Sequence, residues 1–169
     1  VGHLQSARDF ADGRRIEDTH GEMNRLYQVE GHLTVTGGMA DHRLRLATSQ
    51  MLGVALRLAA DLGLSLDDAP EGAAEAVKAH GEWIATCARD LEAHEGHSLV
   101  VAGRHLPAEV HALCFLINEH LGNVGETVTF VELPDIQGVS LAELAESIRA
   151  GGVETLVILG GNPAYNAPV

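Results

Sequence analysis

Three short apolar runs alternate with amphipathic helical segments in the second half of the chain. The runs are Leu99–Ala102, Val128–Val131 and Leu156–Leu159, and helices are predicted between them over Pro107–Leu121 and Ser140–Ala150. Continuously apolar strands that alternate with helices are typical of a parallel sheet covered on both faces. The pattern therefore predicts an α/β fold: a Rossmann-like parallel sheet flanked by helices.

The predicted helices carry boundary signals of their own. Pro107 stands at the start of one helix, where its fixed φ and missing N–H are tolerated. Ser140 with Glu143 three residues later forms the capping-box pattern at the start of the other. Gly151 and Gly152 follow that helix, so we expect it to end near Ala150.

The beginning of the chain lacks the strand and helix alternation. Residues 1–22 are polar and charged, which indicates a peripheral arm or a connection from an earlier domain, and the α/β domain is expected over residues 23–169. Leu26–Glu30 alternates apolar and polar residues, as a half-exposed strand does. Leu33–Thr36 is short and prone to β structure, so it is either a strand or an extended loop.

Apolar residues at helical spacing follow in the middle of the chain. They predict one helix from Thr48 or Ser49 to about Leu62 and a second from about Ala73 to Ala93. Gly81 weakens the second helix by roughly 1 kcal/mol relative to Ala. Together the two helices predict a helical insertion over about residues 46–93.

Composition excludes several classes of function. The 169 residues include 46% apolar residues, which is typical of a globular domain with a core, and carry a formal charge of −13. Such a field repels phosphate backbones, so nucleic acid is not an expected partner. No apolar stretch approaches the roughly 20 residues that span a bilayer. The chain starts with Val1 rather than Met, so we expect an internal piece of a longer protein.

Neither the cysteines nor the histidines form a recognisable site. Cys87 and Cys114 have no CxxC partner and are expected to be buried free thiols. The sequence His94-Glu95-Gly96-His97 is one residue too short for the zinc-binding H-E-x-x-H helix, and Gly96 indicates a helix end. Asp41 next to His42 leaves open a carboxylate–imidazole pair, without a third ligand or a nucleophile. No metal site and no catalytic residue is predicted.

The candidate binding residues are Gly160, Gly161, Asn162 and Pro163, which follow the last apolar run. Ligands of parallel sheets lie beyond the carboxyl ends of the strands, and two glycines allow a close backbone approach. A contact with a nucleotide-like or pterin-like ligand and a plain strand-exit turn both agree with this sequence. Gly103-Arg104 follows an earlier run, where Arg104 could meet a phosphate or a carboxylate. No dinucleotide-binding G-x-G-x-x-G follows any run, and no P-loop motif is present.

Several segments together resemble one known family. They are Met23–Glu30 (MNRLYQVE), Thr34–Leu44 (TVTGGMADHRL), Val101–Gly103, Ile117–Glu119 with Leu121-Gly122, and Leu159–Pro168 (LGGNPAYNAP). They are similar to the molybdopterin-oxidoreductase-like subunits of exported bacterial respiratory complexes, above all the iron–sulfur and molybdopterin-like subunit of alternative complex III. The resemblance covers roughly residues 8–168 and is weakest over residues 64–97.

The resemblance implies an α/β domain from the middle of a larger oxidoreductase of the respiratory chain. It also implies export by the twin-arginine route and a place on the periplasmic side, within a membrane-associated electron-transfer complex. In molybdopterin enzymes the G-x-N-P turn lies near the pterin, which points here to Gly160–Pro163. This chain has no cysteine set for an iron–sulfur cluster, so such clusters are expected elsewhere in the parent protein.

The expected function is therefore a scaffold domain that is not catalytic alone. It would contact other domains of the parent protein and subunits of the complex, without direct membrane insertion and without a cofactor of its own. In the alternative complex III branch the molybdopterin-like region holds no molybdenum cofactor. Two alternatives stay open: a domain that binds molybdopterin guanine dinucleotide in an active oxidoreductase, and a module that binds a nucleotide-type small molecule.

Overall fold

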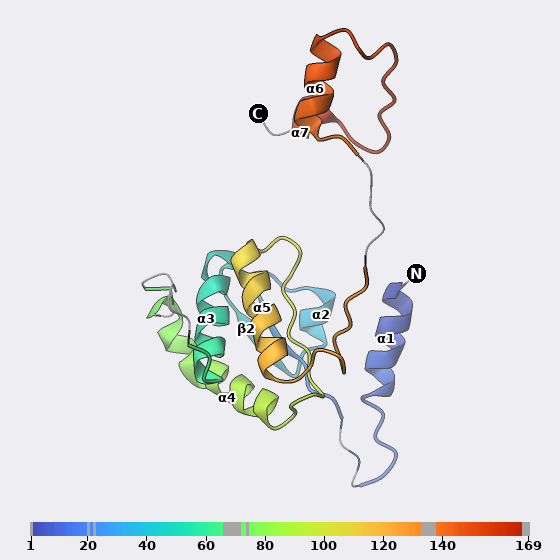
Figure 1. Ribbon diagram of the computed structural model, residues 1–169. Helices are drawn as coiled ribbons and strands as arrows, with labels where there is room; N and C mark the ends of the chain where they lie inside the picture. The colour runs from blue at the N-terminus through green and yellow to red at the C-terminus, as the bar shows by residue number, and fades with distance from the viewer. Residues whose placement is uncertain are drawn as a thin grey trace. The chain divides into compact units, whose positions relative to one another are not determined.

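The computed structural model in Figure 1 describes residues 2–19, 21, 23–65, 72–73, 75–132 and 138–166. The chain forms two compact units, Val1–Phe130 and Val131–Val169. Helices and parallel strands are both present, so the mixed helix and sheet class predicted from the sequence is confirmed at this coarse level. Each unit is described by itself.

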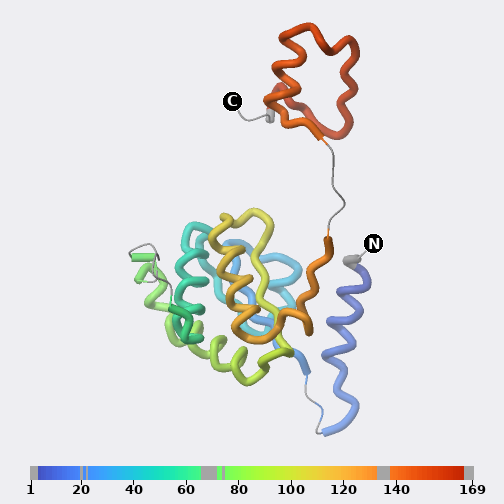
Figure 2. Tube along the Cα trace, viewed as in Figure 1, coloured from blue at the N-terminus to red at the C-terminus, as the bar shows by residue number. Residues whose placement is uncertain are grey.

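Three helices build the core of the first unit. They are α3 (Met51–Asp61), α4 (Gly81–Glu92) and α5 (Ala108–His120), and α3 contacts both of the others (Figures 1 and 2). Their apolar stripes meet around Ile84, Ile117 and Leu121, which are almost completely buried. The predicted helical segments are thus confirmed, because each stripe is covered by the other helices.

The helix predicted over residues 73–93 is divided. Its first part is the 3-10 helix η2 (Glu75–His80), and α4 begins at Gly81. The helix predicted from Thr48 likewise starts with a 3-10 turn, η1 (Thr48–Gln50), before α3. Gly81 is the residue at which the sequence predicted a weak point, and the change from 3-10 to α geometry lies there.

Two strands form the sheet that the described residues contain. β1 (Tyr27–Glu30) and β2 (His42–Arg45) are parallel, with Tyr27 opposite His42 and Glu30 opposite Arg45. The half-exposed strand predicted at Leu26–Glu30 is therefore confirmed. The crossover contains the single helical turn α2 (Val35–Gly38), capped by Thr34. The segment Leu33–Thr36 is therefore not a strand: Val35 and Thr36 are helical, and Thr34 is extended just before them.

The N-terminal residues form the helix α1 (Gly2–Asp12) and a polar connection to β1. Arg14 donates two hydrogen bonds to the Asp41 carboxylate, one of them 2.9 Å long, and the Asn24 N–H donates to the Gly13 carbonyl. Asp41 also accepts a hydrogen bond from the Leu26 N–H. Polar contacts thus join residues 13 and 14 to the segments that directly precede β1 and β2.

The strand pairing predicted for the three apolar runs of the second half is not observed among the described residues. Val128 forms one isolated bridge with Val124, and the runs Leu99–Ala102 and Leu156–Leu159 form no ladder. In the first run the Val100 N–H and carbonyl are bonded by the side chain of Asn118 instead of a neighbouring strand. A Rossmann-like sheet is therefore not confirmed for the residues described.

The second unit consists of α6 (Leu141–Arg149), α7 (Pro163–Asn166) and extended connections. The predicted capping box is confirmed: the Glu143 N–H donates to the Ser140 hydroxyl, and the Ser140 N–H donates to the Glu143 carboxylate. Gly151 has a φ of +74°, the left-handed conformation common after a helix end. None of the described residues 138–165 is buried.

Candidate functional site

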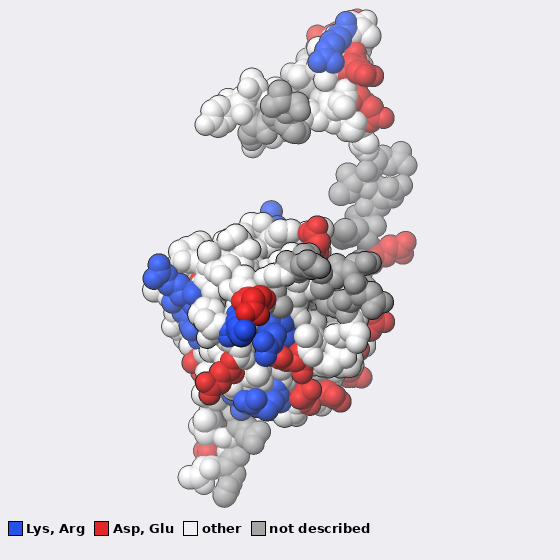
Figure 3. Space-filling model, turned by 90° about the vertical axis from the view of Figure 1, so that its left-hand side faces the viewer, with Lys and Arg blue, Asp and Glu red and all other residues white. Residues whose placement is uncertain are grey.

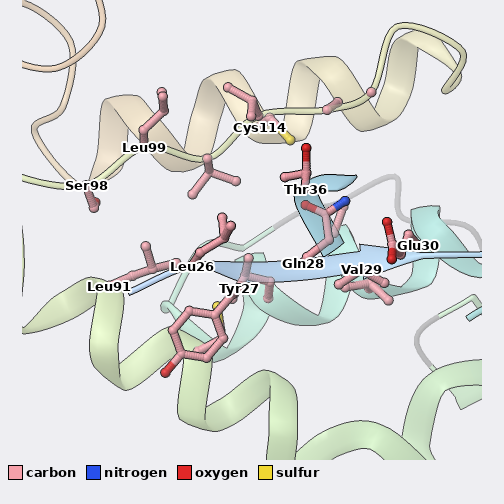
Figure 4. A pocket seen from close by; sticks show the side chains of 18 of the residues that line it. Leu26, Tyr27, Gln28, Val29, Glu30, Thr36, Leu91, Ser98, Leu99 and Cys114 are labelled. Atoms are coloured by element: carbon pink, nitrogen blue, oxygen red, sulfur yellow. The ribbon is translucent and has the colours of Figure 1, made fainter. Parts of the chain in front are cut away.

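A large apolar cleft lies beside β1 within the first unit. Its volume is about 1180 Å³, and Figure 4 shows β1 crossing it, with Ser98 and Leu99 on the opposite side. Backbone segments Met23–Gly31 and His97–Gly103 form two of its borders, and α3, α4 and α5 supply apolar side chains to its lining. Within the described first unit, this cleft is where the strand edge, the core and several polar groups meet.

Among the residues that the structure describes, one edge of β1 has no strand paired with it. The carbonyls of Leu26 and Glu30 accept hydrogen bonds from the His42 and Leu46 N–H groups, so these residues face β2. Backbone groups of successive strand residues point to opposite edges, and the N–H and carbonyl groups of Tyr27 and Val29 therefore face away from β2. Both residues line the cleft. The cleft thus borders a free strand edge.

Two asparagines hold the opposite border in an extended, strand-like path. Asn118 accepts from the Val100 N–H at 2.9 Å and donates to the Val100 carbonyl, while Asn123 accepts from the Ser98 N–H at 3.3 Å. Asn123 also donates to Asn118, and both residues are buried. The Ser98 carbonyl accepts from the Thr127 hydroxyl, so the N–H and carbonyl groups of both Ser98 and Val100 are bonded on this side. In an extended segment the N–H and carbonyl groups of Leu99 and Val101 then point to the other edge.

A polar cluster stands at one end of the cleft. Arg25 donates two hydrogen bonds to the Asp90 carboxylate, at 2.7 and 2.6 Å, and lies 3.2 Å from His94 Nε2. The hydrogen bond from Arg25 keeps the pKa of Asp90 below its usual value. Burial, with the nearby Asp90 carboxylate, raises the pKa of Tyr27 to about 12. Arg25 thus holds the Asp90 carboxylate and the His94 ring together at this end of the cleft.

Aromatic rings pack against one another at the same end. The Tyr27 ring stacks on the His42 ring, with centroids 4.5 Å apart, and meets Trp83 edge to face at 5.5 Å. Trp83 also lines the cleft and is the single tryptophan of the chain. Its fluorescence therefore offers a direct report on this site.

Glu30 organises the other end of the cleft. Its carboxylate accepts hydrogen bonds from the Thr34 hydroxyl at 2.6 Å and from Arg43 Nε at 2.5 Å, and the residue is almost completely buried. These bonds, led by that of Thr34, lower the pKa of Glu30. A Cβ on Gly37 would lie 1.9 Å from a Glu30 carboxylate oxygen, so only glycine is accommodated there. Glu30 thus fixes the turn that returns the chain to β2.

Charge at the surface is mixed, and the cleft itself is acidic. Figure 3 shows basic side chains lying next to acidic ones on one face. Three carboxylates line the cleft (Asp9, Glu30 and Asp90), against one guanidinium, Arg25. Arg43, outside the lining, offsets Glu30. The net field over the cleft is therefore weakly negative, within a chain of formal charge −13.

The candidate binding residues lie in the second unit, apart from this cleft in sequence. Gly160 has a φ of +75°, and neither Gly160 nor Gly161 has an atom within 4 Å of an added Cβ. Asn162 accepts from the Tyr165 N–H, and Pro163 begins α7. The open, left-handed turn agrees with both the strand-exit and the ligand-contact hypotheses, so the assignment of these residues stays a prediction.

The other candidate residues have structural partners. Asp41 is bonded to Arg14 rather than His42, whose ring stacks on Tyr27. His94 interacts with the Asp90 carbonyl, 2.7 Å from its Nδ1, and α4 ends before Gly96, whose φ is +70°. Arg104 lies in a turn in which the Leu106 N–H donates to the Gly103 carbonyl. Local contacts account for Asp41, His42 and His94, whereas the partner expected for Arg104 stays a prediction.

Both cysteines are free thiols, as predicted, and Cys87 is buried while Cys114 is half-buried. Burial raises the pKa of the Cys87 thiol to about 12 and also raises that of Cys114. A thiol with a raised pKa is a poor nucleophile near neutral pH. Cys87 belongs to the core cluster and Cys114 packs against it, so burial in the apolar interior accounts for both pKa directions.

Sequence reasoning missed the two asparagines that shape the cleft. A signal was present at Asn118, because this polar residue directly follows Ile117 on the inward side of α5. A buried asparagine needs hydrogen-bond partners, and an unpaired backbone segment supplies them. Asn123 follows Gly122, in a turn where an asparagine is ordinary, and carried no comparable signal.

Neither metal ligation nor membrane crossing is indicated in the described part of the chain. No group of three or more His, Cys, Asp or Glu residues is arranged to hold a metal ion there. No described helix combines the length and apolarity needed to cross a bilayer.

No protein-family model matches the chain, and a search of curated proteins finds no significant relative.

Proposed function

We propose that this chain is a scaffold domain of a molybdopterin-oxidoreductase-like subunit in a bacterial respiratory electron-transfer complex. Its task is to pack against cluster-bearing domains of the parent protein and against partner subunits on the periplasmic side of the membrane. The identity of the complex rests on the resemblance of Met23–Glu30, Thr34–Leu44 and Leu159–Pro168 to that family.

The observation that carries the scaffold role is exposed apolar surface. The cleft of the first unit is open and lined largely by apolar residues, and the second unit exposes Val157 and Leu159, the latter to 89%. Soluble monomers rarely expose apolar patches of this kind, which usually mark contacts with other proteins. A domain that completes its burial within a larger assembly accounts for both surfaces.

The same proposal includes the finer fold. In the assembled parent protein, Leu99–Ala102, Val128–Val131 and Leu156–Leu159 become strands of a Rossmann-like parallel sheet. Support comes from the apolar composition of the runs, from the strand-like path of Ser98–Ala102, and from the free edge of β1. Iron–sulfur clusters belong to other parts of the parent protein in this proposal.

A second candidate is a domain that binds molybdopterin guanine dinucleotide. The observation that favours it is the open turn at Gly160–Pro163, where backbone groups are accessible and Gly160 is left-handed. A ligand phosphate or pterin amide could then approach the backbone closely. In this case the parent oxidoreductase holds the cofactor between this domain and others.

Cofactor analysis of the longer protein that contains this chain separates the two candidates. The scaffold proposal expects an assembled complex that transfers electrons while molybdenum and pterin stay far below one per protein. Stoichiometric molybdenum and pterin, lost on replacing Gly160 and Asn162 by Val and Ala, would overturn it in favour of the second candidate. A thermal-shift series with nucleotides addresses a simple nucleotide-binding module, because a ligand at 100-fold excess over its Kd adds about 2.7 kcal/mol.

A further inference from the structure

We infer that the cleft of the first unit is a slot for an added β-strand, supplied by an extended segment of another polypeptide with apolar side chains at alternate positions and basic flanks. The slot lies between the free edge of β1 and the free edge of Ser98–Gly103. This inference rests on the proposed scaffold function and names the kind of partner segment that the scaffold receives.

The backbone groups supply the first argument. Tyr27 and Val29 turn their N–H and carbonyl groups away from β2, toward the cleft that they line. Leu99 and Val101 turn theirs away from the asparagine network, and both also line the cleft. A strand edge with unpaired groups is a ready template for another strand. Here two such edges border the same space.

The asparagines supply the second argument, because they prepare one border in advance. Asn118, Asn123 and the Thr127 hydroxyl, which donates to the Ser98 carbonyl, bond the inner edge of residues 98–100, and the outer edge is left available. Both asparagines are buried and bonded to each other at 3.1 Å, so this border is held in place before a partner arrives. Binding then costs less ordering entropy than pairing with a flexible segment.

Side chains and charge define the occupant. Apolar residues of the core cluster line the cleft, including Val54, Leu58 and Ile117. A strand turns every second side chain to the same face, so alternate apolar residues fit an apolar lining. Arg25 neutralises Asp90 and Arg43 neutralises Glu30, which leaves the Asp9 carboxylate of the lining without an ion pair among those the structure shows. This remaining charge, in a chain of formal charge −13, favours lysine or arginine at the ends of the incoming segment.

The experiment uses the full chain and a defined probe, the peptide acetyl-Lys-Val-Thr-Val-Thr-Val-Lys-amide. Binding is followed by the fluorescence of Trp83, which lines the cleft, and by amide hydrogen exchange. We expect saturable binding that slows exchange at Tyr27 and Val29 but leaves the β2-facing amides Gln28 and Glu30 unchanged. Protection of Tyr27 and Val29 in the chain without peptide would overturn the inference, because the two edges would already be paired.

Two matched peptides test the strand geometry and the charge. A peptide with the same side chains and N-methyl groups at alternate amides cannot pair along one edge, and we expect it to bind at least about tenfold more weakly through the loss of several hydrogen bonds. A peptide with glutamate at both ends should bind more weakly at low salt and approach the lysine peptide at high salt. Equal affinity of the methylated and unmethylated peptides would overturn the inference.

One pair of variants tests the second border. Val101 is 72% exposed, so both Val101→Pro and Val101→Ala are compatible with the folded chain. Proline removes the N–H that points into the slot, and we expect about 2- to 10-fold weaker peptide binding for one lost hydrogen bond. Alanine keeps the N–H and should stay within about twofold of the parent chain. Equal effects of both substitutions would contradict a backbone role for Val101.

The outcomes also separate this inference from the proposed function. If no peptide binds while the longer protein transfers electrons without molybdenum, strand addition fails and the scaffold function stands. If the peptide binds as described while the longer protein holds stoichiometric molybdenum, the slot stands and the non-catalytic scaffold fails.

Discussion

The two units of the chain carry helices with similar amphipathic patterns, yet they differ sharply in burial. Every buried apolar side chain of the described residues lies between Leu44 and Leu121, in the first unit. In the second unit α6 has no buried residue, and the apolar run that follows it is exposed. An apolar stripe thus indicates which side chains of a helix face a core, whereas their burial depends on other elements that pack against the stripe. In the first unit those elements are α3, α4 and α5.

The strongest test of this difference uses isoleucines in two comparable helices. Ile117 in α5 is completely buried, while Ile148 in α6 is 45% exposed. We expect Ile117→Ala to lower the free energy of unfolding by about 2–5 kcal/mol, through lost burial and a cavity. Ile148→Ala should change it by no more than about 0.5 kcal/mol. Urea unfolding followed by Trp83 fluorescence and by far-ultraviolet circular dichroism measures both; similar losses would mean that α6 is covered in the free chain.

Asn118 tests the run Leu99–Ala102, in which the Val100 backbone groups are hydrogen-bonded by a side chain but no strand is paired with the run. Asn118→Ala leaves the Val100 N–H and carbonyl without their partner, and we expect a loss of about 1–3 kcal/mol and faster amide exchange at Val100. Glu119→Ala, at the exposed neighbouring position, is the control and should leave both unchanged within about 0.5 kcal/mol. Unchanged exchange in Asn118→Ala would show that Val100 is held by something other than this side chain.

The helices of the first unit and the strand β1 could be predicted from the sequence because their signals are local. A stripe such as that of α3 and the alternation in Leu26–Glu30 report on side chains within one element. The strand pairing could not be predicted in the same way, because it depends on which edge meets which neighbour. The Asn118 side chain bonds the Val100 backbone groups that a neighbouring strand would otherwise bond. The pattern of apolar residues over 99–102 is the same in both cases, so it does not predict which partner is present.

The candidate site follows the same rule. The sequence pointed to Gly160–Pro163 through a local turn signal, and the structure does contain an open turn there. The cleft beside β1 was not predicted, since its borders come from segments about 70 residues apart. Only the polar residue Asn118 on an inward helix position hinted that an unpaired backbone lay nearby.

Two adjacent glycines sharpen the comparison at the covered edge of β1. A Cβ on Gly37 would lie 1.9 Å from a Glu30 carboxylate oxygen, whereas a Cβ on Gly38 would meet no atom within 4 Å. We expect Gly37→Ala to cost about 1–3 kcal/mol, because Glu30 must leave its partners or the crossover must shift. Gly38→Ala should be neutral or stabilising by up to about 1 kcal/mol. Thermal unfolding measures both, and equal midpoints would show that the crossover is free to move.

Lowering the pH should change stability less than the substitutions above. It distinguishes the two units, because their carboxylates accept hydrogen bonds from different kinds of partner. In the first unit Asp41 is bonded by Arg14 and Asp90 by Arg25, and these hydrogen bonds hold both pKa values below the usual range. In the second unit the pKa of Glu143 is lowered by the Ser140 N–H and hydroxyl, within its own helix. A lowered pKa in the folded chain stabilises it above the unfolded value of about 4, and this contribution is lost as the pH falls through the folded value.

We therefore expect the urea midpoint reported by Trp83 to fall as the pH decreases from about 5 to about 3. Asp41→Asn should lower the midpoint at pH 7 and flatten this decline, so that its curve meets the parent curve at acid pH. Asp12→Asn, at an exposed position, should follow the parent curve, and Glu143→Gln should alter only the helical signal of α6. Parallel curves for Asp41→Asn and the parent chain would contradict the role of the Arg14–Asp41 pair. They would mean that the N-terminal connection does not stabilise the first unit through this ion pair.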